Sequence, residues 1–237
     1  MITALIPARA GSRRIKDKNS RKLDGRPLFL WSADVARACR LIDYVVVSSD
    51  SERILDMATG EGINTRRRRP EAASDTATDE DVLYDWLSGE TRPVGADDLL
   101  VYLRPTTPFR RLAWVEEAIT SFIAAKHASG LRSVQEMDES AFKCFRMDPS
   151  GRLMTLLGGD DVDMANLPND SYAKTYRANG AVDIVRLEDL RDSGKMYGNF
   201  CMAYLTPATV EIDTPANWAY AEFQAAKNGG VLNVYSY

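Results

Sequence analysis

The segment ALIPARAGSRRIKDKNSRKLDG (Ala4–Gly25) combines a short apolar run with a high density of positive charge. The run up to Ile6 is typical of a buried strand, and the small residues after it are typical of a tight turn. Beyond this turn, ten residues contain six cations: Arg13, Arg14, Lys16, Lys18, Arg21 and Lys22. Because like charges repel one another, a segment of this kind is expected to bind an anion.

The turn after this first strand offers backbone N–H groups to a phosphate, but it matches no common phosphate-binding fingerprint. Neither GxxxxGK[ST] nor GxGxxG is present. Long cationic side chains take their place, which suits a mobile cover over a triphosphate. On composition alone, a solvated basic loop is the alternative.

Outward from this segment, aliphatic runs alternate with amphipathic stretches. This alternation predicts an α/β fold with a parallel sheet covered by helices on both faces, with ligands at the carboxyl ends of the strands. The basic loop, SSDS and RPTTPFRR each follow such an end. The predicted strands are Ile2–Ile6, Tyr44–Ser48, Ile63–Arg68, Leu99–Leu103 and Ser133–Glu136, and the predicted helices are Pro27–Arg40, one beginning at Ser51, Asp79–Leu87 and Leu112–Lys126.

The alternation breaks down between about residues 139 and 177, where the chain is polar and rich in glycine and aspartate. We interpret this stretch as an insertion, a lid or a dimer contact within one domain spanning residues 1–237. A strand at 178–186, a short helix at 187–194, a strand at Val210–Asp213 and a helix at Thr214–Lys227 are predicted to follow.

The charge balance argues against a nucleic-acid-binding protein. The net charge of the 237-residue chain is −4, so basic segments are local features of an acidic protein. Arg66–Arg69 form a run of four arginines, but five acidic residues follow within the next twelve positions. This pattern favours a loop that contacts a base or phosphate, with a solvated charged loop as the alternative.

Cysteine and histidine usage narrows the possible chemistry further. The three cysteines are isolated, with no CxxC, which suits a reducing compartment. The one histidine, His127, ends a helical pattern, so histidine-based catalysis is not expected. Because no apolar run reaches the roughly 18 residues of a membrane span and no signal peptide is evident, we expect a cytoplasmic protein without membrane contact.

The segment VEIDTP (Val210–Pro215) is a candidate metal site. Strand periodicity would place Glu211 and Asp213 on one face, and Mg²⁺ binds one or two carboxylates together with substrate phosphates. An acidic strand end followed by a helix cap at Thr214 is the alternative interpretation.

These features, in this order, resemble the acylneuraminate cytidylyltransferase family, whose members make CMP-activated sugar acids from CTP. The resemblance implies a Rossmann-like nucleotidyltransferase fold, a homodimer, and Mg²⁺ or Mn²⁺ as cofactor. It is carried by the segments IPARAGSRRIKDKNSRKLDGRPL, VVVSSDSERI, RPEAASDTAT, LRPTTPFR, YRANGAVDI and EIDTPANWAYAE.

The resemblance also implies roles for individual residues. Lys18 and Arg9 would be catalytic, with Lys18 stabilising charge on the α-phosphate, and Glu211 and Asp213 would hold the metal. Residues implied to bind nucleotide are Ala8, Arg9, Ala10, Gly11, Ser12, Arg13, Lys18, Asn19, Arg69, Ser74 and Asp79. Residues implied to bind the acceptor are Arg104, Thr106, Lys174 and Asn179.

The acceptor motifs depart from the family pattern. Members that act on sialic-type sugars read LQPTSPLR, whereas this chain has Arg104 in place of the glutamine. Asp79 replaces a small hydroxyl residue near the base, and Asn169 and Asp170 stand where sugar-acid members often have PRQ. The expected acceptor is a nonulosonic or related 2-keto-3-deoxy sugar acid.

Three alternatives remain. A guanidinium at position 104, with Arg110, Arg111 or Lys174 nearby, would suit a small phosphonate acceptor. Arg104 would equally suit an ion pair with Asp79 or another carboxylate as a structural feature. A non-catalytic nucleotide-binding or nucleic-acid-binding protein is the alternative from another class.

Overall fold

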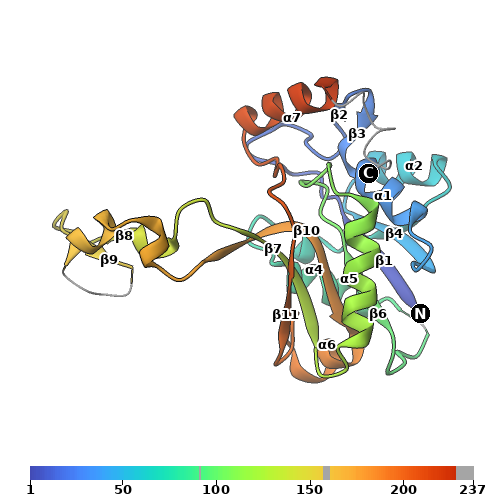
Figure 1. The fold of residues 1–237 in the computed structure, drawn as a ribbon. Coiled ribbons are helices and arrows are strands. Elements are labelled where there is room, and N and C mark those ends of the chain that lie inside the picture. Colours follow the sequence, from blue (N-terminus) through green and yellow to red (C-terminus); the bar gives the residue numbers. More distant parts are fainter. Residues whose placement is uncertain (91, 157–160, 228–237) are drawn as a thin grey trace.

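The computed structural model describes residues 1–90, 92–156 and 161–227, and its centre is a seven-stranded sheet (Figure 1). The strand order is β11-β7-β10-β6-β1-β4-β5. Strands β6, β1, β4 and β5 run parallel to one another, whereas β10 is antiparallel to both β6 and β7. The strands are β1 (Ile2–Pro7), β4 (Tyr44–Ser49), β5 (Asn64–Arg67), β6 (Leu99–Tyr102), β7 (Gly130–Glu136), β10 (Tyr176–Arg186) and β11 (Cys201–Leu205).

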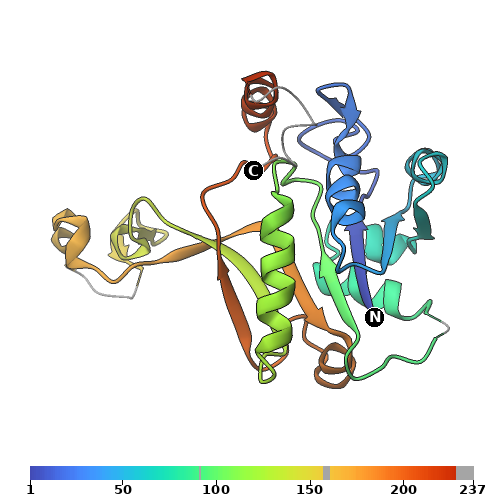
Figure 2. The ribbon, with the colours of Figure 1, turned by 45° about the vertical axis from the view of Figure 1, so that its right-hand side comes forward.

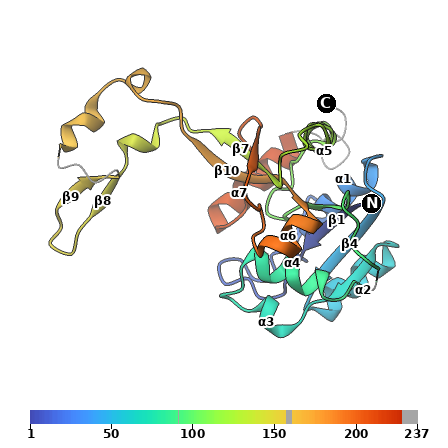
Figure 3. The same ribbon diagram turned by 90° about the horizontal axis from the view of Figure 1, so that it is seen from below.

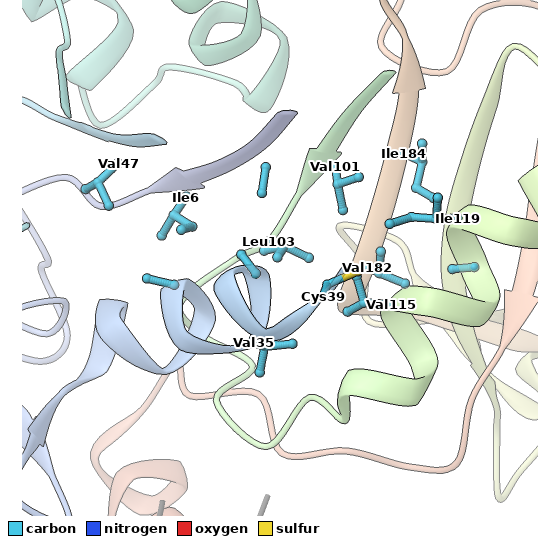
Figure 4. Packing of buried hydrophobic residues seen from close by; sticks show 14 of the residues in the cluster. Ile6, Val35, Cys39, Val47, Val101, Leu103, Val115, Ile119, Val182 and Ile184 are labelled. Carbon is cyan, nitrogen blue, oxygen red and sulfur yellow. The ribbon is translucent and has the colours of Figure 1, made fainter. Parts of the chain in front are cut away.

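Helices cover both faces of this sheet, because its central strands are apolar on both sides. Helices α1 (Leu28–Ala38), α2 (Glu52–Gly60) and α5 (Leu112–Ala124) pack on one face, where Ile6, Val101 and Ile184 meet α1 and α5 (Figure 4). Helices α4 (Asp79–Leu87) and α6 (Leu187–Ser193) pack on the other face (Figure 3). A short helix, α3 (Pro70–Ala73), precedes α4.

A small third core lies beyond the carboxyl ends of the strands and joins the two ends of the chain. The hairpin β2 (Lys22–Leu23) and β3 (Arg26–Pro27) packs here with α7 (Pro215–Lys227). We call this unit the cap; its buried residues are Ile15, Leu23, Leu28, Trp31, Ile212, Trp218 and Ala221.

An arm projects from the body of the molecule between β7 and β10 (Figures 1 and 2). Within its described part, the hairpin β8 (Phe145–Met147) and β9 (Leu153–Thr155) has no buried residue. The arm also holds three short 3₁₀ helices: η1 (Ala141–Lys143), η2 (Val162–Asn166) and η3 (Asn169–Ser171). The arm occupies most of the 139–177 stretch, and its role as lid or dimer contact stays a prediction.

The alternating pattern of strands and helices predicted for an α/β fold is confirmed, including the bounds of α4. The predicted strand Val210–Asp213 is wrong, because its backbone bonds elsewhere: Ile212 N–H donates to the carbonyl of Thr106 (2.7 Å). The sheet edge is formed instead by β11, which the sequence pattern did not indicate. In the described ranges, no helix has the length and apolar character needed to cross a membrane.

Arg110 anchors the loop after β6 and is fully buried. Its guanidinium donates to Ser32 Oγ (2.8 Å) and to the carbonyls of Arg104 (2.9 Å), Gly180 (3.2 Å) and Ala181. Burial, together with the charge of Arg104, lowers the pKa of Arg110 to about 9. Arg110 is therefore a structural residue, and the expectation that it helps bind a charged acceptor is wrong.

Replacing Arg110 with glutamine should lower the free energy of unfolding by about 2–3 kcal/mol, because buried carbonyl acceptors would lose their donor. The matched control is Arg111→Gln, because Arg111 is exposed and lies over the ring of Trp114. Urea denaturation measures both variants, and equal losses would contradict the structural role of Arg110.

Candidate active site

A cavity of about 230 Å³ lies at the carboxyl ends of the central strands. Most predicted site residues from the first half of the chain meet in it, although they come from three separate segments. These residues are Arg9, Ser12, Lys18, Asn19, Ser74, Asp79, Arg104 and Thr106. We call this space the first cavity.

The basic loop is held over the first cavity by contacts at both of its ends. Arg9 donates to the carbonyl of Ser74 (2.8 Å) and to Asp75 (3.1 Å), while Arg13 Nε donates to Asp75 (2.6 Å). Asn19 Nδ2 donates to the carbonyl of Arg9 (2.8 Å). Asp75 thus draws together two of the cations that would otherwise repel one another.

Lys18 links the loop to the segment that carries the predicted metal ligands. Its Nζ donates to the carbonyl of Ile212 (2.9 Å) and lies 3.2 Å from Asp213 Oδ1. The Lys18 side chain is only 13% exposed. Because Ile15 and Ile212 also share the core of the cap, the loop is anchored from residue 15 onward. A loop movement beyond this point would disturb the cap.

A second cavity of about 450 Å³ lies on the other side of the Lys18–Asp213 contact. Lys18 lines the first cavity and Asp213 lines the second, so the two spaces adjoin at this ion pair. The lining residues of the second cavity include Gln135, Arg177, Asn179, Thr209, Glu211, Asp213, Asn217 and Tyr220.

A bulge in β10 shapes the boundary between the cavities. The register of β10 against β7 shifts between Ala178 and Asp183. Gly180, within this bulge, has φ +63°, and a Cβ there would lie 3.2 Å from Thr107 Oγ1 and 3.8 Å from Glu211 Oε1. Glycine therefore lets the chain turn closely past the carboxylate of Glu211.

The pair Glu211 and Asp213 fits a divalent cation that also takes ligands from its substrate. Both line the second cavity, while Ile212 between them is buried in the cap. Partial burial and the neighbouring charge of Asp213 raise the pKa of Glu211. A cation bound between the two carboxylates would offset their repulsion and lower this pKa again. Within the described ranges, no group of three or more His, Cys, Asp or Glu side chains is placed to hold a metal alone. Two carboxylates with water and phosphate oxygens are typical of Mg²⁺.

Arg104 forms ion pairs with two carboxylates. Its guanidinium contacts Asp183 and lies 2.5 Å from Asp79 Oδ2, and its side chain is 16% exposed. Although burial alone would lower it, these two carboxylates raise the pKa of Arg104 above its ordinary value. The ion pair with Asp79 that the sequence offered as an alternative is therefore present.

Other predicted residues lie outside both cavities. Ala8 is buried, and its N–H and C=O bond to Ser48 and Ser49. Lys174 pairs with Glu136 (3.0 Å) at the base of the arm. Ala10, Gly11 and Arg13 belong to the exposed part of the basic loop.

Arg69 also lies outside both cavities, in a separate depression. Its Nε is 2.5 Å from Asp85, and its Nη2 donates to Ser88 (3.2 Å). The neighbouring Arg68 lines the first cavity instead, and sequence reasoning missed it. In a run of four arginines, nothing in the pattern marks the one that turns inward. Arg177 in the second cavity was likewise missed, although it lies inside the quoted motif YRANGAVDI.

The fold is the Rossmann-like fold of solved nucleotidyltransferases. A solved CMP:2-keto-3-deoxy-manno-octonic acid synthetase complexed with CTP superposes with a TM-score of 0.71 at 17% identity, covering 95% of this chain and 98% of that one. A 4-diphosphocytidyl-2C-methyl-D-erythritol synthase from Anaerococcus prevotii superposes with a TM-score of 0.63 at 13% identity, covering 94% and 97% of the two chains.

Sequence comparison finds similarity to cytidylyltransferases. The cytidylyltransferase family model matches residues 3–95. The CMP-N,N'-diacetyllegionaminic acid synthase of Legionella pneumophila is 28% identical, over 93% of this chain and 94% of that protein. An N-acylneuraminate cytidylyltransferase of Escherichia coli is 25% identical over 99% of this chain, which spans 54% of that protein's length. The chain is similar to acylneuraminate cytidylyltransferases, and these relatives identify it as a nucleotidyltransferase.

Proposed function

We propose that this protein transfers CMP from CTP to a nonulosonic or related 2-keto-3-deoxy sugar acid and releases pyrophosphate. The observation that carries the proposal is the pair of adjoining cavities, one cationic and one holding two carboxylates, which meet at Lys18 and Asp213. Such an arrangement suits a reaction in which the nucleotide and the acceptor meet at one phosphorus atom.

The first cavity would bind CTP, with Arg9, Ser12 and Lys18 at the triphosphate. An acceptor oxygen attacks the α-phosphorus in line, and the bond to pyrophosphate breaks. Little covalent chemistry is required of the protein, so positioning and electrostatic stabilisation supply most of the rate. Lys18, which is largely shielded from water, would stabilise the charge that grows on the α-phosphate.

Glu211 and Asp213 would hold Mg²⁺ or Mn²⁺ at the boundary of the two cavities. A bound divalent cation would neutralise phosphate charge and make the acceptor hydroxyl more acidic. Asp213 would then exchange its contact with Lys18 for the metal, which leaves Lys18 free to bind phosphate.

The second cavity suits a monoanionic, hydroxylated acceptor. Arg177 offers one guanidinium for a carboxylate, and Asn217 offers an amide for a hydroxyl group. The phosphonate alternative has less support, because Arg104 is paired with carboxylates and Arg110 is buried. The names of the relatives in Legionella pneumophila and Escherichia coli also refer to sugar acids.

The arm would contact a second copy of the chain. Its exposed apolar side chains include Phe145, Met147 and Leu153, with Met147 72% exposed. A homodimer would cover these groups. Light scattering of the protein and of a Met147→Lys variant tests this assembly. The expected cytoplasmic location and the absence of nucleic-acid binding also stay predictions.

The acceptor is tested by pyrophosphate release from CTP and Mg²⁺ with N-acetylneuraminate, with N,N'-diacetyllegionaminate and with phosphonoformate. We expect turnover with at least one sugar acid, and loss of turnover when EDTA removes the metal. Turnover with phosphonoformate alone would contradict the proposed acceptor class. Full turnover in EDTA would contradict the role of Glu211 and Asp213.

A further inference from the structure

The segment that carries Glu211 and Asp213 is irregular, yet its backbone is bonded at several points. Ile212 N–H donates to the carbonyl of Thr106 (2.7 Å), and Lys18 Nζ donates to the carbonyl of Ile212 (2.9 Å). The Ile212 side chain is fully buried in the cap. These contacts fix the middle of the segment, but they do not reach the backbone N–H of Asp213.

Asn217 holds the backbone of Asp213 and of the residue after it. Its Oδ1 accepts from three donors: Asp213 N–H (3.3 Å), Thr214 N–H (3.0 Å) and Thr214 Oγ1 (2.8 Å). The Thr214 hydroxyl accepts in turn from Asn217 N–H (3.2 Å). Thr214 directly precedes α7, and Asn217 is the third residue of that helix, so the pair forms a capping box. An ordinary capping box ends at the cap residue, whereas this one also binds the N–H of Asp213.

The separation of the two carboxylates depends on this backbone. Glu211 lies on one side of Ile212, close to the bulge at Gly180, where an added Cβ would lie 3.8 Å from Glu211 Oε1. Asp213 lies on the other side, next to the capping box. Carboxylates that share one cation must keep their separation although they repel each other, and groups behind the ligands supply this restraint. The bond from Asp213 N–H to Asn217 is placed to do so.

The other end of the Asn217 amide is available to a ligand. Three donors surround one end of the amide, so that end is the oxygen and the orientation of the group is fixed. Within the described part of the chain, Nδ2 has no hydrogen-bond partner. Asn217 lines the second cavity together with Glu211 and Asp213. The amide therefore presents a donor to the cavity in which the acceptor is expected to bind.

We propose that Asn217 is a positioning residue for CMP transfer, an assignment that rests on the proposed function. Through Oδ1 it fixes the backbone that carries the metal ligand Asp213, and through Nδ2 it donates to a hydroxyl group of the acceptor. One side chain thereby sets the acceptor relative to the metal ligand. An aspartate at this position could fill the first role but not the second, because a carboxylate offers no donor.

The first test measures metal binding without turnover. The full chain is titrated with Mn²⁺ in the absence of nucleotide and acceptor, and free Mn²⁺ is measured by electron paramagnetic resonance. We expect Asn217→Ala to weaken Mn²⁺ binding by about 10-fold, the usual cost of losing a group behind a metal ligand. Asn217→Asp keeps the accepting oxygen and should bind Mn²⁺ at least as tightly as the wild type.

The matched control for this titration is Ser51→Ala, which removes the N-cap of α2, outside both cavities. It should leave the affinity for Mn²⁺ unchanged. Equal affinities of the wild type and Asn217→Ala, or equal losses in Asn217→Ala and Ser51→Ala, would overturn the positioning role while the proposed function stands. A wild-type chain that takes up no Mn²⁺ would contradict the metal assignment, and the positioning role would fail with it.

The second test separates the acceptor from the metal by pyrophosphate release at saturating CTP and Mg²⁺. We expect Asn217→Asp to raise KM for the sugar acid by about 10-fold, the value of one hydrogen bond, and to change kcat less. Asn217→Ala should lower kcat as well. An unchanged KM in Asn217→Asp would overturn the contact of Nδ2 with the acceptor. If the wild type binds Mn²⁺ but turns over no sugar acid, the proposed acceptor fails, and the Mn²⁺ titration still decides the role of Oδ1.

Discussion

Asp213→Ala should lower kcat by about 10³-fold, because the loss of a metal ligand removes several kcal/mol of stabilisation from the transition state. CTP should still bind, more weakly, because Arg9, Ser12 and Lys18 remain in the first cavity. Calorimetry gives the affinity for CTP, and pyrophosphate release gives the rate. The fold should survive, because Lys18 retains the carbonyl of Ile212 as an acceptor.

The matched control is Asp56→Ala, which removes an exposed carboxylate from α2, outside both cavities. This variant should turn over like the wild type. A rate for Asp213→Ala close to that of the control would contradict the assignment of the metal to Glu211 and Asp213.

Lys18→Met should lower kcat by about 10²–10³-fold, which is the usual cost of removing one group that stabilises developing negative charge. Methionine keeps the length of the side chain and removes its charge. Because Lys18 also neutralises Asp213 in the ligand-free structure, the variant should bind Mg²⁺ at least as tightly as the wild type. The rate is measured at saturating CTP, so that weaker nucleotide binding is not mistaken for slower chemistry.

Lys16→Met is the control for this variant, because Lys16 is an exposed cation of the same loop. We expect it to change the apparent affinity for CTP slightly and kcat very little. Equal losses of kcat in both variants would show that the loop acts through its total charge, rather than through Lys18 at the α-phosphate.

Much of the fold was predictable because local and global signals agree. The apolar strands of the parallel half are buried on both faces, so they read as continuous aliphatic runs. The helix Asp79–Leu87 was predicted to the residue, since acidic residues favour its first turn. The segment Val210–Asp213 alternates like a strand but is not one, because buried and exposed residues also alternate in irregular chain, here one that bonds to a loop and to Lys18.

Site residues were predictable where they belong to one sequence motif. They were not predictable where adjacent residues of the same type could each fill the role. Arg9, Ser12, Lys18 and Asn19 come together because they share one loop after β1. Arg68 and Arg69 are both arginines, so the sequence does not distinguish them. The pairing of β5 with β4 decides which of the two side chains points toward the cavity. The partners of Arg104 depend on Asp183, which is distant in sequence and is brought close by the antiparallel pairing of β10 with β6.

The central claim is CTP-dependent transfer of CMP, and phosphorus NMR of the reaction mixture tests it most directly. With the full chain, Mg²⁺, CTP and a nonulosonic acid, the account predicts the signal of a new phosphodiester and that of pyrophosphate, growing at equal rates, and neither signal with ATP, GTP or UTP. Pyrophosphate with free CMP and no phosphodiester would mean hydrolysis. Equal product formation from all four nucleotides would contradict the account.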